Sequence, residues 1–298
     1  MPLSPSTKTP QVRASIVFGS QGAAPGSAAR RVLLIGSMLA ADATGTVRTS
    51  GIAATTVTTP AGIAALDTPV RALSPDHAAQ IAGRGSELHR GAIAAFAQSR
   101  EVELWLGPVT YGDTPVAASA TITPTISGLA ACTLRVTIGG ESVDIGISAT
   151  DTVSIIGRKL SAAINAQRDW PVTATNTWST GATVVTAKCA GPRGNAITVR
   201  CAILTSTAVY EVTNETSVTA AGLTIALTGG AVAGGVYRLA SGSVDDNVSA
   251  LLTACATRKF DRIAFAGYLV SGTASSNIGR VTSHAVSLSD SAQADQQV

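Results

Sequence analysis

The sequence predicts an α+β protein: an open α/β sheet core interrupted by an inserted β-rich domain containing one helix, with an extended N-terminal arm. Three observations predict this class. Apolar strand segments alternate with amphipathic helices on both sides of residues 113–235. Inside those limits, short Val, Ile and Thr segments are separated by glycine turns. The first ten residues carry Pro2, Pro5 and Pro10, which excludes a helix there.

This pattern divides the 298 residues into four parts. Residues 1–28 form the arm, residues 29–112 the first part of the α/β core, and residues 113–235 the inserted domain. Residues 236–298 form the second part of the core and a polar C-terminal tail. Because glycines flank the insertion at both ends, we expect it to protrude from the core and to move partly as a body.

The arm contains one predicted strand, at residues 12–18, which a loose segment separates from the nearest core. The residues expected to form the inter-subunit strand are Val12, Ala14, Ile16, Val17 and Phe18. A strand on a tether can pair with the sheet edge of another chain. The residues alone leave open whether it does so or forms an edge strand of its own chain.

The first part of the core alternates strands and helices, which favours a parallel crossover. Ser74, Pro75 and Asp76 suit the start of a helix, because they supply a cap, a first-turn proline and an acid at the positive helix end. Ser86 is the expected cap of the next helix. The predicted elements are strands at 32–36, 70–73 and 102–108, a loop or hairpin at 43–60, and helices at 74–82 and after Ser86, the second with a stripe of Leu88, Ala92, Ala95 and Phe96.

The insertion is predicted to hold strands on both sides of a single helix. Asp151 is the expected N-cap of that helix, in which Val153, Ile156, Leu160 and Ile164 recur at three- and four-residue steps. The predicted strands lie at 120–126, 132–138, 142–147, 183–189, 197–204 and 219–227.

The α/β pattern resumes after the insertion with a helix at 244–257, beginning near Asp245 and Asp246, and a strand at 262–267. Val248, Leu251, Leu252 and Cys255 are expected to face inward. About three convincing parallel strands are fewer than such a sheet usually contains. Either the short strands complete the sheet, or a further segment of polypeptide from elsewhere completes it.

Composition argues against several classes of function. Charged residues make up 13% of the chain, the net charge is +3, and no basic run exceeds the Arg30–Arg31 pair, so we expect no nucleic-acid partner. No segment is long enough to insert into a membrane as a helix. The four cysteines lack metal or redox spacing and are expected to be buried thiols. The sequence leaves open a bridge of Cys189 with either Cys132 or Cys201.

No constellation of catalytic residues is found, so we predict no enzyme, no catalytic residue, no cofactor and no metal site. Gly83-Arg84-Gly85 follows a helix and lacks a third glycine, which argues against a phosphate loop. His77 and His89 lie on consecutive helices and could meet, but no carboxylate cluster accompanies them. An alternative function is a secreted or surface β-rich binding module that recognises glycans through Trp170 and Trp178. A third hypothesis is a hydrolase on the α/β core, but the sequence identifies no nucleophile for it.

Four stretches, in order, resemble the tail sheath protein of Mu-like contractile bacteriophages. They lie between residues 29 and 235, and comprise 32–36; 79–88 with 94–96 and 103–105; 138–141 with 151–152 and 162–166; and 190–197. The resemblance covers the arm, part of the core and the insertion. Members of the family continue beyond the point where this sequence ends.

The resemblance implies a structural subunit of the virion, assembled in the host cytoplasm. Such subunits form a homo-oligomer of stacked or helical hexameric rings around a tail tube protein, and on contraction they drive the tube through a bacterial envelope. Terminal arms lend strands to neighbouring subunits in this family. A second sheath polypeptide that completes the core is a further expected partner.

Overall fold

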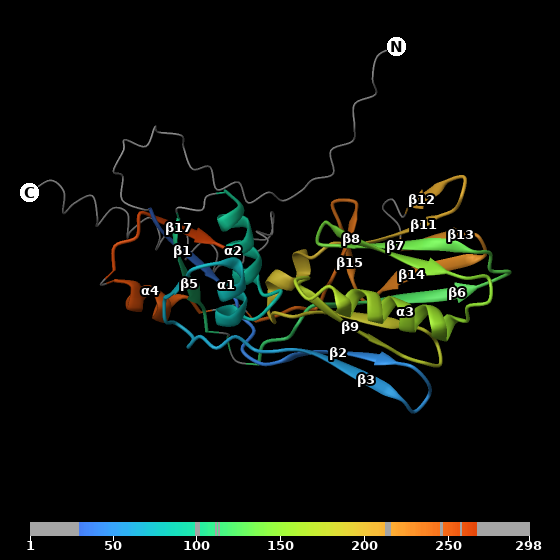
Figure 1. Cartoon of the computed structure of the whole chain (residues 1–298), viewed down its shortest axis with the longest axis horizontal. Helices are drawn as coiled ribbons and strands as arrows, with labels where there is room; N and C mark the ends of the chain where they lie inside the picture. Colours follow the sequence, from blue (N-terminus) through green and yellow to red (C-terminus); the bar gives the residue numbers. More distant parts are fainter. Residues whose placement is uncertain are drawn as a thin grey trace, which may run out of the picture.

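The computed structural model describes residues 30–98, 102–110, 112, 114–211, 216–244, 247–256 and 258–266. Two bodies lie side by side along its long axis (Figure 1). The predicted α+β class is confirmed, with four α-helices and mixed sheets in these ranges. The predicted arm residues Val12, Ala14, Ile16, Val17 and Phe18 lie outside the described residues, as do Asp245, Asp246 and the tail beyond residue 266.

The first body, here called the α/β body, is built on a four-stranded sheet in the order β17-β1-β5-β4. Strand β1 pairs in parallel with β17 and β5, and β4 pairs antiparallel with β5. A short fourth strand, β4, extends the three predicted parallel strands on the β5 side of the sheet. The elements are β1 (Arg31–Gly36), β4 (Val70–Ala72), α1 (Pro75–Ala82), α2 (Glu87–Gln98), β5 (Glu103–Pro108), α4 (Ser249–Cys255) and β17 (Arg262–Phe265).

Helices cover both faces of this sheet, which explains the continuous apolar sequence of β1. Val32 and Leu34 pack with α1 and α2 on one face. Leu33 and Ile35 pack with Leu251 of α4 on the other. Val248 and Cys255 are buried as predicted, but α4 is shorter than the predicted helix at 244–257.

The second body, here called the β-rich body, holds two larger sheets around one core. A seven-stranded sheet has the order β13-β14-β6-β10-β9-β2-β3, and a four-stranded sheet the order β12-β11-β7-β8. Side chains of both sheets and of helix α3 form a single hydrophobic cluster. The elements are β2 (Ala43–Arg48), β3 (Ala54–Thr59), β6 (Ser119–Ile126), β7 (Cys132–Ile138), β8 (Glu141–Ile147), α3 (Val153–Ala166), β9 (Val172–Asn176), β10 (Thr183–Ala187), the 3₁₀ helix η1 (Pro192–Ala196), β11 (Val199–Leu204), β12 (Val209–Glu211), β13 (Ser217–Ala220), β14 (Leu223–Thr228), and the β15 (Ala231–Ala233) and β16 (Val236–Arg238) hairpin.

The hairpin of β2 and β3 belongs to the β-rich body, whereas the sequence-based division assigned residues 43–60 to the α/β core. One parallel backbone pairing, Thr46 with Thr175, joins β2 to β9. The Asn176 side chain continues this pairing, because its amide accepts from Arg48 N at 2.7 Å and donates to Arg48 O at 3.3 Å. Hydrogen bonds from a side chain to the backbone of another strand produce no periodic pattern in the sequence. The sequence therefore could not predict that this hairpin joins the β-rich body.

Two predicted elements differ from the structure: the N-cap of α3 and the strand at 219–227. Thr152, not Asp151, caps α3, with its hydroxyl accepting from Ile155 N. The Asp151 carboxylate instead accepts from Ser148 N and pairs with Lys159 at 2.5 Å. The predicted strand at 219–227 is a hairpin, because Ala221 and Gly222 both adopt positive φ and turn the chain.

All four cysteine side chains are buried in the structure. Burial raises the pKa of the Cys201 thiol to about 12, so this group is held as an inert neutral thiol. Within the described ranges, no helix has both the length and the apolar character required to span a bilayer.

Candidate functional site: the polar junction between the two bodies

The α1–α2 loop forms the side of the α/β body that meets the β-rich body. Both helices begin with the same local arrangement, in which a serine hydroxyl accepts from the N–H three residues later, at His77 and at His89. Each imidazole Nδ1 then accepts a backbone N–H, from Leu73 in the first case and from Gly85 in the second. The two histidines, which the sequence suggested could meet, therefore each stabilise the start of their own helix.

Gly85 lies where the backbones of the two bodies come close together. Its φ is +76°, in the left-handed region that favours glycine. A Cβ placed there would lie 2.3 Å from the Trp170 carbonyl oxygen and 2.6 Å from Lys188 Nζ. Both neighbours belong to the β-rich body, so only a glycine lets the loop lie against it.

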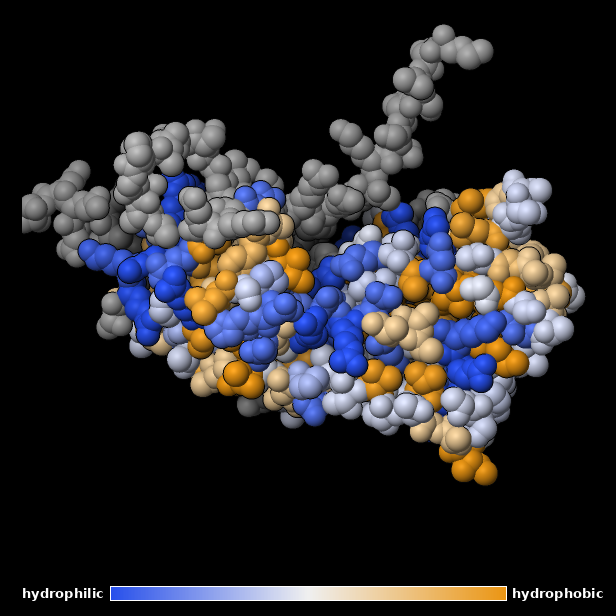
Figure 2. Space-filling model, viewed as in Figure 1, coloured by the Kyte–Doolittle hydropathy of each residue, from blue (hydrophilic) through white to orange (hydrophobic). Residues whose placement is uncertain are grey.

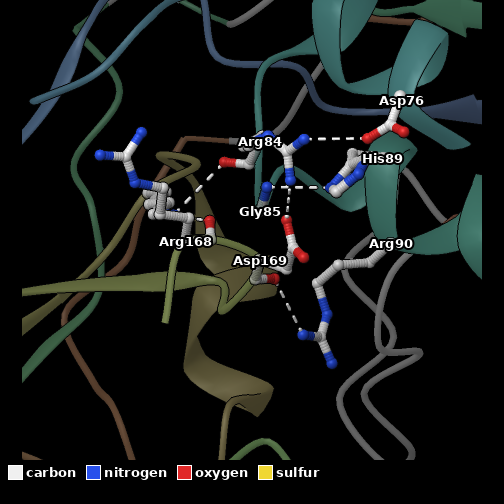
Figure 3. Close-up of polar contacts among 8 residues, drawn as sticks. Asp76, Arg84, Gly85, His89, Arg90, Arg168 and Asp169 are labelled. Carbon is white, nitrogen blue, oxygen red and sulfur yellow. Dashed lines mark hydrogen bonds and ion pairs between the residues drawn. The ribbon is translucent and has the colours of Figure 1, made fainter. Parts of the chain in front are cut away.

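Ion pairs surround this contact (Figure 3). Arg84, in the α1–α2 loop, pairs with Asp169 of the β-rich body at 3.0 Å and with Asp76 of α1 at 2.9 Å. Arg90 pairs with Glu141 at 2.8 Å and donates to the Asp169 carbonyl oxygen at 3.2 Å. Most of these side chains are exposed, so each pair contributes about 0.2–1 kcal/mol.

A second cross-contact lies deeper. Arg193 of η1 pairs with Glu87, the first residue of α2, at 3.0 Å, with side-chain exposures of 25% and 14%. The same carboxylate accepts from Ser37 N at 3.3 Å, next to β1. This arrangement places a carboxylate at the positive end of α2 and ties both the strand and the helix to η1.

Lys188 closes the junction with hydrogen bonds to two backbone carbonyl oxygens. Its ammonium donates to Arg168 O at 2.6 Å and to Arg84 O at 3.3 Å, one in each body. Burial lowers the pKa of Lys188 to about 8, although the nearby Asp169 charge opposes this shift. Burial likewise lowers the pKa of His89, which suits a neutral imidazole whose Nδ1 accepts from Gly85.

The junction is thus polar, while each body has its own hydrophobic core. Hydrophilic residues gather where the bodies meet on the face seen in Figure 2. Ion pairs and hydrogen bonds to carbonyls can break and re-form with water, whereas a shared apolar core could not separate so readily. These contacts hold the two bodies in one orientation.

Sequence reasoning singled out two parts of this junction without finding its role. Gly83-Arg84-Gly85 follows a predicted helix and belongs to the resemblance, as does Gly191-Pro192-Arg193-Gly194, but neither pattern predicts an ion pair. Their partners, Asp169 and Glu87, are distant in the sequence. An ion pair between two isolated charged residues produces no recognisable sequence motif. In the described ranges, no group of three or more His, Cys, Asp or Glu side chains is placed to hold a metal ion.

The proposed glycan-binding aromatics are not both at the surface. Trp170 is 3% exposed and belongs to the core of the β-rich body. Burial of Trp170 does not favour a binding module that uses both tryptophans.

No protein-family model matches the chain, and no curated protein sequence matches it. Among solved structures, the D1-D2-D3 domains of the flagellar cap protein FliD from Escherichia coli are similar at 18% identity, covering 49% of this chain and 52% of that chain with a TM-score of 0.21. The D2-D3 domains of the flagellar cap protein from Serratia marcescens match at 16% identity, over 47% of this chain and 96% of that chain, with a TM-score of 0.16. The chain spans about half the length of the first of these structures. A TM-score this low establishes no shared fold.

Proposed function

We propose that this chain is a structural subunit of a contractile phage tail sheath, which polymerises as stacked rings around a tail tube. The observation that carries the proposal is the two-body arrangement. Most of the β-rich body leaves the α/β sheet between β5 and β17, and its β2–β3 hairpin leaves between β1 and β4. Among the described residues, the two bodies meet through the polar junction that contains Gly85, Arg84, Arg90, Lys188 and Arg193. The ordered resemblance to sheath proteins supplies the biological setting.

A sheath subunit must keep its internal structure while its contacts with neighbours change. Separate hydrophobic cores meet that need, because each body keeps its own core when its orientation changes. Several exposed ion pairs of about 0.2–1 kcal/mol each give a junction that holds one orientation and can be reset by forces between subunits. No bound nucleotide is required for such a relaxation between two packings.

The α/β sheet offers a place for strands from other polypeptides. Among the described residues, β17 pairs only with β1, so its outer edge is open for a further strand. A neighbouring arm or a second sheath polypeptide would fill this edge. The tail tube protein is the expected inner partner.

The test is electron microscopy of the purified full chain in negative stain. We expect rings or hollow cylinders, alone or after addition of the tail tube protein. A chain that remains a monomer at every concentration and salt condition, with and without the tube protein, would contradict the proposed function.

A further inference from the structure

The outer strand of the seven-stranded sheet is an exposed edge. Strand β3 pairs with β2 and, in the described part of the chain, with no other strand. Its sequence, ATTVTT, carries no charge, and all of its residues except Val57 and Thr59 are exposed. Threonine and valine are residues that favour extended pairing.

The other edges of the three larger sheets are shorter than β3 or carry charged residues, and the β17 edge is the one proposed above for a strand of another polypeptide. Strands β4 and β12 are three residues long, and β17 has four residues and begins with an arginine. Strand β8 carries Glu141 and Asp144, and Lys159 donates to its Gly146 carbonyl oxygen. Strand β13 is four residues long and lies against β11 and β12. Short length and charge are the usual devices that prevent edges from pairing, and β3 has six uncharged residues.

The register shows which backbone groups of β3 are free. Thr49 N donates to Ala53 O, and Arg48 lies opposite Ala54. Because ladder bonds alternate along an antiparallel pair, the odd-numbered residues of β3 bond to β2. The N–H and C=O groups of Ala54, Thr56 and Thr58 therefore point to the open edge.

We propose that β3 pairs with β3 of a second copy of this chain, antiparallel and about a two-fold axis at Thr56. In this register Ala54 lies opposite the partner's Thr58, and Thr56 opposite the partner's Thr56. The three facing pairs would exchange about six backbone hydrogen bonds. All the facing side chains are neutral, so no like charges oppose the contact.

Two exposed hydrophobic side chains support a second copy as the occupant. Ile52 precedes β3 and is 96% exposed, and Ile63 follows it and is 79% exposed, the two largest values among the exposed large hydrophobics of the described residues. The end of the hairpin is a hydrophobic protrusion in Figure 2. A two-fold axis at Thr56 places Ile52 of each copy opposite Pro60 of the other, three residues before Ile63, so each exposed hydrophobic end approaches the other copy.

This contact goes beyond the proposed function. Stacked rings hold all copies in the same direction, whereas a two-fold pair holds them in opposite directions. The β3 pair would therefore form between free chains and separate before rings assemble.

Cross-linking of the full chain tests the pairing. Cα atoms of facing residues in a hydrogen-bonded pair are about 5.5 Å apart, which a disulfide can span. We expect Thr56→Cys to form disulfide dimers under mild oxidation, because the native cysteines are all buried. Ser179→Cys, at an exposed loop position of the same body, is the matched control and should remain largely monomeric. Equal yields from the two variants would overturn the proposal.

Charge exchange gives a second measurement. Thr56→Lys and Thr56→Glu each place like charges at the axis, so each alone should associate at least about tenfold more weakly than the unchanged chain in sedimentation. Mixing the two variants should restore dimers. Unchanged association of either variant, or no recovery on mixing, would contradict β3 pairing. Rings without Thr56→Cys dimers would refute this inference alone, and dimers without rings would refute the proposed function alone.

Discussion

Removal of residues 1–18 is expected to abolish polymers while leaving a folded protomer. The reason is that Val12, Ala14, Ile16, Val17 and Phe18 are proposed to extend a neighbour's sheet, and backbone pairing of this kind is lost when the strand is absent. Negative-stain microscopy would show whether rings or cylinders form. Circular dichroism and thermal unfolding would show whether the remaining chain is folded.

A shorter deletion is the matched control. Removal of residues 1–10 takes away the proline-bearing segment but keeps the predicted strand, so polymers should still form. Normal polymers after removal of residues 1–18 would show that the arm does not link subunits. Loss of polymers in both deletions would instead assign the role to the first ten residues.

Gly85→Ala is expected to have the largest effect of any single substitution at the junction. The left-handed φ costs about 1–2 kcal/mol for alanine, and the new Cβ would also meet a backbone carbonyl and Lys188. Together these predict a loss of about 2–4 kcal/mol in the free energy of unfolding. Denaturant unfolding measures the loss, and hydrogen exchange at the junction amides should report separation of the two bodies.

Gly128→Ala is a control that separates the cost of the left-handed backbone conformation from the cost of the steric clash at Gly85. Gly128 has a φ of +70°, close to that of Gly85, but an added Cβ would meet nothing within 4 Å. It should cost only the conformational part, about 1–2 kcal/mol, and leave exchange at the junction unchanged. If Gly85→Ala behaved like Gly128→Ala, the close approach at the junction would contribute nothing.

The elements that were predictable are those governed by local chemistry. Ser74, Pro75 and Gly83 bound α1 as the sequence indicated, because caps and breakers act within one helical turn. Strand β1 was recognisable because burial on both faces requires an unbroken apolar run. Strand β9 was not predicted, because apolar and polar residues alternate only weakly in Val172–Asn176. Its Asn176 side chain instead accepts a hydrogen bond from Arg48 of β2.

The junction could not be predicted in the same way. Arg84 meets Asp169, and Arg193 meets Glu87, through folding of segments that are distant in the chain. The sequence does not distinguish a charged residue that faces water from one that pairs with the other body. Glycine-rich connections suggested a loosely tethered insertion, but the contacts of Gly85 and Lys188 hold it against the α/β body.

The central claim is that subunits are joined by strands that one chain lends to another. The most direct measurement mixes equal amounts of ¹⁴N- and ¹⁵N-labelled full chain, allows assembly, and identifies lysine cross-links from Lys8, beside the predicted arm strand, by mass spectrometry. The account predicts links whose two peptides carry different labels, because the arm lies on a neighbouring copy. Links from Lys8 that always join peptides of the same label would place the arm on its own chain and contradict the account.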